Sequence, residues 1–249
     1  MSILKTDLNN AISQTLAAIA DFTKERSAVR FASSLGVEDI VLADIISRNH
    51  LAVAIFTLDT GRLNPETYEL LSSIKHIPIK VMSPTSERVE AMVSEFGING
   101  FYNSQEARKA CCAARKIEPL QRALKGADGW LTGLRKEQSD ARQNLELIAF
   151  DNVTQLDKCN PLLHWTSEQI WAYVTAFNLT VNKLHSQGYP SIGCAPCTRA
   201  VATGEHPRAG RWWWESDTQK ECGLHVDDSG KLVRTASATT SISEKAFSL

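Results

Sequence analysis

The chain has 249 residues, with 27 Lys and Arg against 28 Asp and Glu, so its formal net charge is −1. At 43% hydrophobic and 22% charged residues, the composition is that of a globular protein with one substantial core, which excludes wholesale disorder. A near-neutral chain lacks the basic field that binds a nucleic-acid backbone, so we expect no nucleic-acid partner. We also expect no membrane association and a cytoplasmic location, because no apolar run reaches roughly 18 residues and the N-terminus lacks a secretory pattern.

Strand-like and helix-like patterns alternate along the first part of the chain. Short apolar runs predict strands at 29–32, 51–58, 77–82 and 129–132. Apolar residues at helical spacing predict helices at 7–26, 37–47, 86–96, 104–124 and 166–177, with another beginning at 64–65. The predicted helix at 166–177 begins with a capping box of Thr166 and Gln169. Strands alternating with helices predict an α/β fold, with a mostly parallel sheet and helices on both faces.

The C-terminal part of the sequence has a different character. From residue 215 onward it is polar, rich in Ser and Thr, and nearly free of aromatic residues. Such a composition buries little apolar surface, so we predict a mobile C-terminal segment. We therefore divide the chain into a nucleotide-binding α/β domain at 1–210 and a C-terminal segment at 211–249.

Small and hydroxyl-bearing residues follow two predicted strands. Ser33 and Ser34 come directly after the first strand, and Thr60 comes after the second, between Asp59 and Gly61. The carboxyl ends of parallel strands are where open α/β sheets bind their ligands, so two such joints predict a nucleotide cleft. A tight turn without a ligand is the alternative for the first joint. The sequence holds no Walker A motif and no Gly-x-Gly-x-x-Gly, which argues against a P-loop kinase or a dinucleotide enzyme.

Four cysteines occur in two pairs. Cys111 and Cys112 are adjacent on a predicted helix, and Cys194 and Cys197 form a Cys-x-x-Cys motif in a loop rich in Gly and Pro. Four thiolates suit zinc or an iron–sulfur cluster, and a Cys-x-x-Cys alone also suits dithiol redox chemistry. Adjacent helical side chains diverge by about 100°, which a cluster with separate iron corners tolerates better than one tetrahedral ion. The pattern therefore favours the cluster, with zinc and redox chemistry as alternatives.

Basic residues flank the adjacent cysteines. Helical spacing places Arg115 one turn beyond Cys111 and Lys116 one turn beyond Cys112, while Arg108 and Lys109 precede the pair. A solvated helix face is the ordinary interpretation of such a run. Beside four thiolates and a nucleotide cleft, a group of cations that binds an anion is the competing interpretation.

Two features of the C-terminal region point to chemistry. Cys222 lies in the polar tail near Lys220 and His225, and cationic neighbours favour a nucleophilic thiolate, although an idle surface thiol is the alternative. Arg208 and Arg211 precede three consecutive tryptophans. Arginine recognises phosphate or sulfate oxygens in a planar, bidentate manner, so these two residues are candidates for anion binding.

Taken together, these motifs resemble the assimilatory adenosine 5′-phosphosulfate (APS) reductases of the phosphoadenosine phosphosulfate (PAPS) reductase family, from about residue 28 to residue 225. The resemblance rests on Cys111-Cys112, on Cys194-Ala195-Pro196-Cys197 and on the run Lys-Glu-Cys-Gly-Leu-His that contains Cys222. It implies a domain similar to the adenine nucleotide alpha hydrolases, followed by a segment that carries the nucleophile.

The resemblance also implies roles for individual residues. Cys222 would be the catalytic nucleophile with His225 beside it, and one 4Fe-4S cluster per chain would be held by Cys111, Cys112, Cys194 and Cys197. The positions that match adenosine contacts are Ser33, Ser34, Leu58, Thr60 and Gly133. The positions that match phosphosulfate contacts are Lys116, Arg142, Arg208, Arg211 and His225. The loop at 138–142 is one residue shorter than the family pattern, so the match at Arg142 depends on how that loop is aligned.

The implied reaction is the reduction of APS to sulfite and AMP, in sulfate assimilation and cysteine biosynthesis. The Cys222 thiolate would attack the sulfur of APS, and thioredoxin or a glutaredoxin-like reductant would release sulfite from the resulting thiosulfonate. Three alternatives remain at this stage: a PAPS reductase acting on the 3′-phosphorylated substrate, a non-catalytic zinc-structured nucleotide-binding module, and an ATP-pyrophosphatase. The loop at 33–39 lacks the full serine-rich signature of the last class. A homo-oligomer is compatible with the resemblance.

Overall fold

The computed structural model describes residues 2–139 and 142–215. Helices and strands alternate through most of this range, as the sequence predicts. The helices are α1 (Ser2–Thr23), α2 (Val37–Arg48), α3 (Pro65–Ser73), α4 (Ser86–Phe96), α5 (Gln105–Cys112), α6 (Glu118–Leu124) and α7 (Ser167–Ala176). The strands are β1 (Val29–Ser33), β2 (Val53–Leu58), β3 (Ile79–Met82), β4 (Gly129–Leu131), β5 (Ile148–Asp151) and β6 (Leu156–Cys159).

The six strands form one sheet in the order β3-β2-β1-β4-β6-β5. Every neighbouring pair is parallel except β5 and β6, which form an antiparallel pair at one edge. The predicted mostly parallel α/β sheet is therefore confirmed. The antiparallel pair is an addition that the sequence patterns did not predict.

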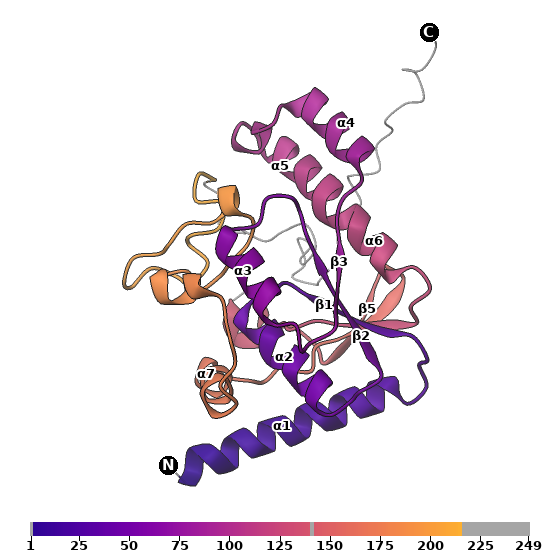
Figure 1. The fold of residues 1–249 in the computed structure, drawn as a ribbon, viewed down its shortest axis with the longest axis vertical. Coiled ribbons are helices and arrows are strands. Elements are labelled where there is room, and N and C mark those ends of the chain that lie inside the picture. The colour runs from indigo at the N-terminus through magenta and orange to yellow at the C-terminus, as the bar shows by residue number, and fades with distance from the viewer. Residues whose placement is uncertain (1, 140–141, 216–249) are drawn as a thin grey trace.

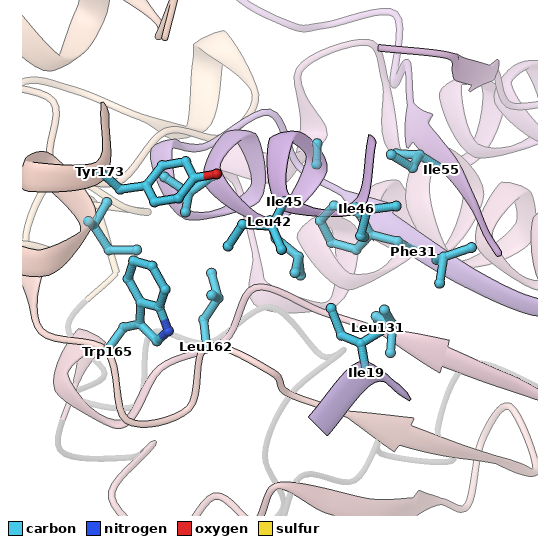
Figure 2. Packing of buried hydrophobic residues seen from close by; sticks show 14 of the residues in the cluster. Ile19, Phe31, Leu42, Ile45, Ile46, Ile55, Leu131, Leu162, Trp165 and Tyr173 are labelled. Carbon is cyan, nitrogen blue, oxygen red and sulfur yellow. The ribbon is translucent and has the colours of Figure 1, made fainter. Parts of the chain in front are cut away.

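Helices cover both faces of the sheet, because successive strand residues point to opposite faces. Helices α2 and α3 lie on one side of β1–β3, and α4, α5 and α6 lie on the other (Figure 1). Ile55 of β2 packs with Ile45 and Ile46 of α2, whereas the next residue, Phe56, packs with Leu120 of α6. Figure 2 shows the larger core, in which side chains from α1, α2 and α7 meet those of the central strands.

Helix α7 begins as its sequence predicts. Thr166 precedes the helix, its hydroxyl accepts a hydrogen bond from the backbone N–H of Gln169, and the Gln169 side chain accepts one from the backbone N–H of Thr166. This reciprocal pair satisfies two donors that the first turn leaves free. In the described part of the chain, every helix is too short or too polar to cross a bilayer.

The predicted helix at 104–124 has an irregular middle. Helix α5 ends at Cys112, a π-helical turn covers Ala113–Ile117, and α6 follows. Pro119 gives a reason for the wider turn, because proline has no N–H and its ring clashes with the carbonyl oxygen four residues earlier, that of Arg115. The wide turn comes directly after the two adjacent cysteines. Turns of this kind are often found at functional sites.

The strand order of the sheet reverses at β1, so β1 and β4 form its switch point. Strands β2 and β3 extend the sheet on one side of β1, and β4 and β6 extend it on the other. Ligands of open α/β folds bind outside the carboxyl ends of the strands at such a switch point. Because Phe31 pairs with Leu131, Ser33 and Gly133 lie at the same level beyond that pair.

Candidate functional site

The joint after β1 is a short loop between Ser33 and the start of α2 at Val37. Ser33 is the buried last residue of β1, and its hydroxyl accepts a hydrogen bond of 3.2 Å from the backbone N–H of Leu35. Leu35 has a φ of 62°, in the left-handed region that non-glycine residues rarely adopt. Ser34 is exposed at the tip of the loop, and α2 starts just beyond it. Both serines therefore lie where the sequence places them, at a helix N-terminus on the ligand-binding edge of the sheet.

The joint after β2 connects this edge to the cysteines. Leu58 is the last residue of β2, and Thr60 is buried two residues later. The Thr60 hydroxyl lies 3.3 Å from the sulfur of Cys194, and its carbonyl oxygen accepts a 2.8 Å hydrogen bond from Arg115. Gly61 then turns the chain with a φ of 67°. Thr60 is thus the direct contact between the predicted nucleotide edge and the predicted metal site.

The joint after β4 holds Gly133 and leads to Arg142. Gly133 is buried, and a Cβ atom there would overlap the carboxylate of Asp39. Arg142 is 5% exposed, and its guanidinium donates a hydrogen bond to the side-chain oxygen of Gln138. Residues 140–141 lie outside the described chain, so the alignment of that loop remains a prediction.

All four predicted cysteine ligands line one small cavity. Cys111 and Cys112 enter it from α5, and Cys194 and Cys197 enter it from the short turn Ala195–Cys197 and the residue before it. The remaining lining residues are aromatic, basic or proline, namely Arg62, Phe101, Arg108, Arg115, Lys116, Pro196, Arg211 and Trp212. The structure therefore brings together two pairs of thiols that are far apart in the sequence.

The thiols sit in a partly dry environment. Burial, together with the neighbouring Cys194, raises the pKa of Cys197 to about 11, and burial also raises the pKa of Cys111. A metal centre that binds thiolates would displace these protons. Over residues 2–139 and 142–215, no three Cys, His, Asp or Glu side chains converge closely enough for one metal ion. Four thiols around one cavity are a ligand set that suits an iron–sulfur cluster or a zinc ion.

Two of the four basic residues around the adjacent cysteines are buried, so the interpretation as a solvated helix face is wrong for Arg108 and Arg115. Both side chains are buried, with Arg108 5% exposed and Arg115 9% exposed. Arg108 forms an ion pair with Glu215, and Arg115 binds the backbone of the β2 joint. Lys116 lines the cysteine cavity, while Lys109 is exposed.

The two late arginines differ in placement. Arg211 is buried against Trp212 and lines the cavity, and Gly193 leaves room for its guanidinium, because a Cβ at that position would collide with it. Arg208 is half-buried and its backbone carbonyl accepts a hydrogen bond from the Arg211 N–H. Trp212 is 1% exposed and packs in the same cluster as Phe101 and Cys197.

The two predicted catalytic residues lie outside the described part of the chain. Cys222 and His225 fall outside the described residues, as does most of the C-terminal segment 211–249; its first residues, 211–215, pack beside the cysteine cavity. Two site residues were not predicted from the sequence: Arg62, which lines the cavity, and Asp39, which contacts the β1 and β4 joints. An acidic residue in the first turn of the helix after β1 was the available signal for Asp39.

This geometry defines a nucleotide-binding type of α/β fold with a four-thiol centre beside its ligand edge. The model of the phosphoadenosine phosphosulfate reductase domain matches residues 28–200. The adenosine 5′-phosphosulfate reductase of Allochromatium vinosum is 49% identical over 210 residues, which cover 83% of this chain and 82% of that protein.

Solved structures share the fold of this chain. The crystal structure of the PAPS reductase from Candida auris, a phosphate complex, has a TM-score of 0.63 and 26% identity, covering 75% of this chain and 90% of that one. The FMN adenylyltransferase of Candida glabrata in complex with ATP shares the fold, with a TM-score of 0.58, 14% identity and coverage of 88% and 75%. The chain belongs to the phosphoadenosine phosphosulfate reductase family.

Proposed function

We propose that this protein is an enzyme that reduces adenosine 5′-phosphosulfate to sulfite and AMP. The observation that carries the proposal is the contact between Thr60 and Cys194, which joins a nucleotide-type strand edge to a four-thiol cavity lined by cations. The relatives named for this reaction, such as the one at 49% identity, support it.

Residues at the strand edge bind the nucleotide. Ser33, Ser34, Leu58, Thr60 and Gly133 all lie at the joints after β1, β2 and β4, where adenosine would be held. The cations for the phosphosulfate are Lys116 and Arg211, which line the cavity, together with Arg142 and Arg208. Cations there admit an anionic substrate and stabilise the charge that develops on the departing phosphate.

Cys222 is the nucleophile of the proposal. Its thiolate attacks the sulfur of APS, the S–O bond to the phosphate breaks, and AMP leaves with the electron pair of that bond. A thiolate of a thioredoxin-like dithiol then attacks the Cys222 sulfur and expels sulfite. The second thiol of the reductant resolves the mixed disulfide, so the two electrons come from the dithiol. His225 lies beside Cys222 in sequence and favours the thiolate.

A 4Fe-4S cluster would be held by Cys111, Cys112, Cys194 and Cys197. When bound, it supplies a fixed anionic centre that organises the neighbouring cations, and the electron balance above requires no redox change from it. Lys116 lines the same cavity as the four thiols. In this proposal it is the cation that links the thiolates to the substrate anion.

Turnover tests the proposal. Purified protein with APS and reduced thioredoxin should release one sulfite and one AMP per thioredoxin dithiol oxidised, and Cys222→Ser should abolish sulfite release while AMP binding persists. Turnover by Cys222→Ser would refute the assignment of the nucleophile. A colourless protein with stoichiometric zinc and no turnover would support the zinc-structured module instead.

A PAPS reductase is the second candidate, because the Candida auris structure carries that name. It uses the same chemistry on a substrate with a 3′-phosphate. A comparison of kcat/KM for APS and PAPS separates the two, and we expect APS to be preferred because the relatives at nearly half identity are named for it.

A further inference from the structure

Asp39 is a buried carboxylate at the switch point of the sheet. It lies in the first turn of α2 and is 7% exposed. Its Oδ2 accepts two hydrogen bonds from Ser34, one of 2.6 Å from the backbone N–H and one of 2.5 Å from the hydroxyl. Asp39 therefore fixes both the backbone and the side chain of the loop that follows β1.

The same carboxylate reaches the loop that follows β4. The backbone of Gly133 hydrogen-bonds to Asp39, and a Cβ at Gly133 would overlap the Asp39 carboxylate. Glycine is thus the residue that lets the β4 loop approach this closely. One side chain joins the two loops between which a ligand of the switch point would lie.

A second acid in this turn strengthens the connection. Glu38 forms a 2.8 Å ion pair with Arg135, which is 4% exposed and belongs to the loop after β4. Arg135 also donates a hydrogen bond to the backbone carbonyl of Trp165, just before α7. The start of α2 is consequently tied to the β4 loop at two points, but only Asp39 also contacts the β1 loop.

Burying a carboxylate costs stability unless its hydrogen bonds compensate fully. Burial raises the pKa of Asp39 to about 6 in spite of the hydrogen bonds from Ser34. Perturbed carboxyl groups of this kind concentrate at functional sites.

We propose that Asp39 is the positioning residue of the nucleotide site, holding the Ser34 and Gly133 loops at the spacing that accepts adenosine. The inference rests on the proposed function, because it assigns the ligand of these loops to the adenosine part of the substrate. Asp39 acts through the two loops and does not take part in the sulfur chemistry.

AMP binding by calorimetry tests this role in the full chain. We expect Asp39→Asn to weaken AMP binding at least tenfold and to raise KM for APS, while kcat falls much less. Asp44→Asn is the matched control: Asp44 is equally buried on the same helix, but it pairs with Arg48 and Tyr173, away from the loops. The control should lower Tm and leave the Kd for AMP within twofold of wild type.

Gly133→Ala provides a second variant, since its Cβ would displace the Asp39 carboxylate from the other side. It should weaken AMP binding as well, and Asp39→Asn combined with Gly133→Ala should be little worse than either alone. Wild-type AMP affinity in Asp39→Asn, or in Gly133→Ala if the first variant does not fold, would overturn the inference. Failure of the wild-type protein to bind AMP would instead refute the proposed function.

Discussion

Arg108 and Glu215 form a buried, two-pronged ion pair between the cysteine helix and the end of the described chain. The Arg108 Nη2 donates to Glu215 Oε2 at 3.0 Å, and its Nε donates to Oε1. The two side chains are only 6% and 7% exposed. Arg108 also lies 4.7 Å from the ring centroid of Trp212. Glu215, the last residue that the structure describes, is therefore held next to the cavity.

Removing one partner of this pair should leave a buried charge. We expect Glu215→Gln to lower the free energy of unfolding by about 3–5 kcal/mol, the usual cost of breaking a buried pair. Formation of the Cys222 thiosulfonate should also slow, because Glu215, seven residues before Cys222 in the sequence, loses its ion pair with Arg108. Denaturant unfolding and quenched mass spectrometry measure the two effects.

An exposed pair on the neighbouring helix supplies the control. Glu118 and Arg122 form an ion pair on α6 with side chains 23% and 41% exposed. Glu118→Gln should cost less than about 1 kcal/mol. An equal loss of stability in the two variants would show that the Arg108–Glu215 pair is no stronger than a surface pair.

The cavity cations should act on substrate binding. We expect Arg211→Gln and Lys116→Gln each to raise KM for APS at least tenfold, and KM of the wild type to rise with ionic strength, since salt screens the attraction. Arg199→Gln is the matched control, because Arg199 lies in the same region but is paired with Glu205 at the surface. A KM unchanged in Arg211→Gln would remove this residue from the anion site.

The pH dependence of stability should reveal Asp39. Its pKa in the folded protein is raised from 3.8 to about 6, mainly by burial and partly by the charge of Glu38, which itself pairs with Arg135. Between these values the folded state binds the proton more tightly, so ionisation of Asp39 opposes folding increasingly as pH rises. The Tm of Asp39→Asn relative to wild type should therefore increase from about pH 4 to about pH 7. A constant difference in Tm would contradict the raised pKa.

The cysteines should differ in their reaction with iodoacetamide and in their effect on the colour of the protein. Cys159 is fully buried in the core and burial raises its pKa to about 12, so iodoacetamide should not label it in the native protein. Cys159→Ala should keep the brown colour of a cluster, whereas Cys194→Ser should lose it. Cys222, the proposed nucleophile, should be labelled. Loss of colour in Cys159→Ala without unfolding would contradict the ligand set.

Local patterns predicted much of the fold and little of its long-range connections. The strand at 53–58 was recognisable because it is a continuous apolar run between covered faces. Strands β5 and β6 were not, since Ile148 and Phe150 are exposed while the charged Lys158 is 2% exposed, which reverses the usual pattern. Neither strand shows a regular alternation of apolar and polar residues.

The site divides in the same way. Sequence spacing paired the cysteines, and the fold then placed both pairs in one cavity. The contact of Asp39 with Gly133 and the Arg108–Glu215 pair join segments that only the folded chain brings together. Arg108 looked like a surface residue because charged helical positions usually are, and its burial follows from a partner far along the chain.

The most direct measurement is the intact mass of the protein after incubation with APS and no reductant, followed by peptide mapping. The account predicts the added mass of one SO₃ group, located on the peptide that contains Cys222, and its release as sulfite when thioredoxin is added. No adduct in the presence of bound nucleotide, or an adduct on another cysteine, would contradict it.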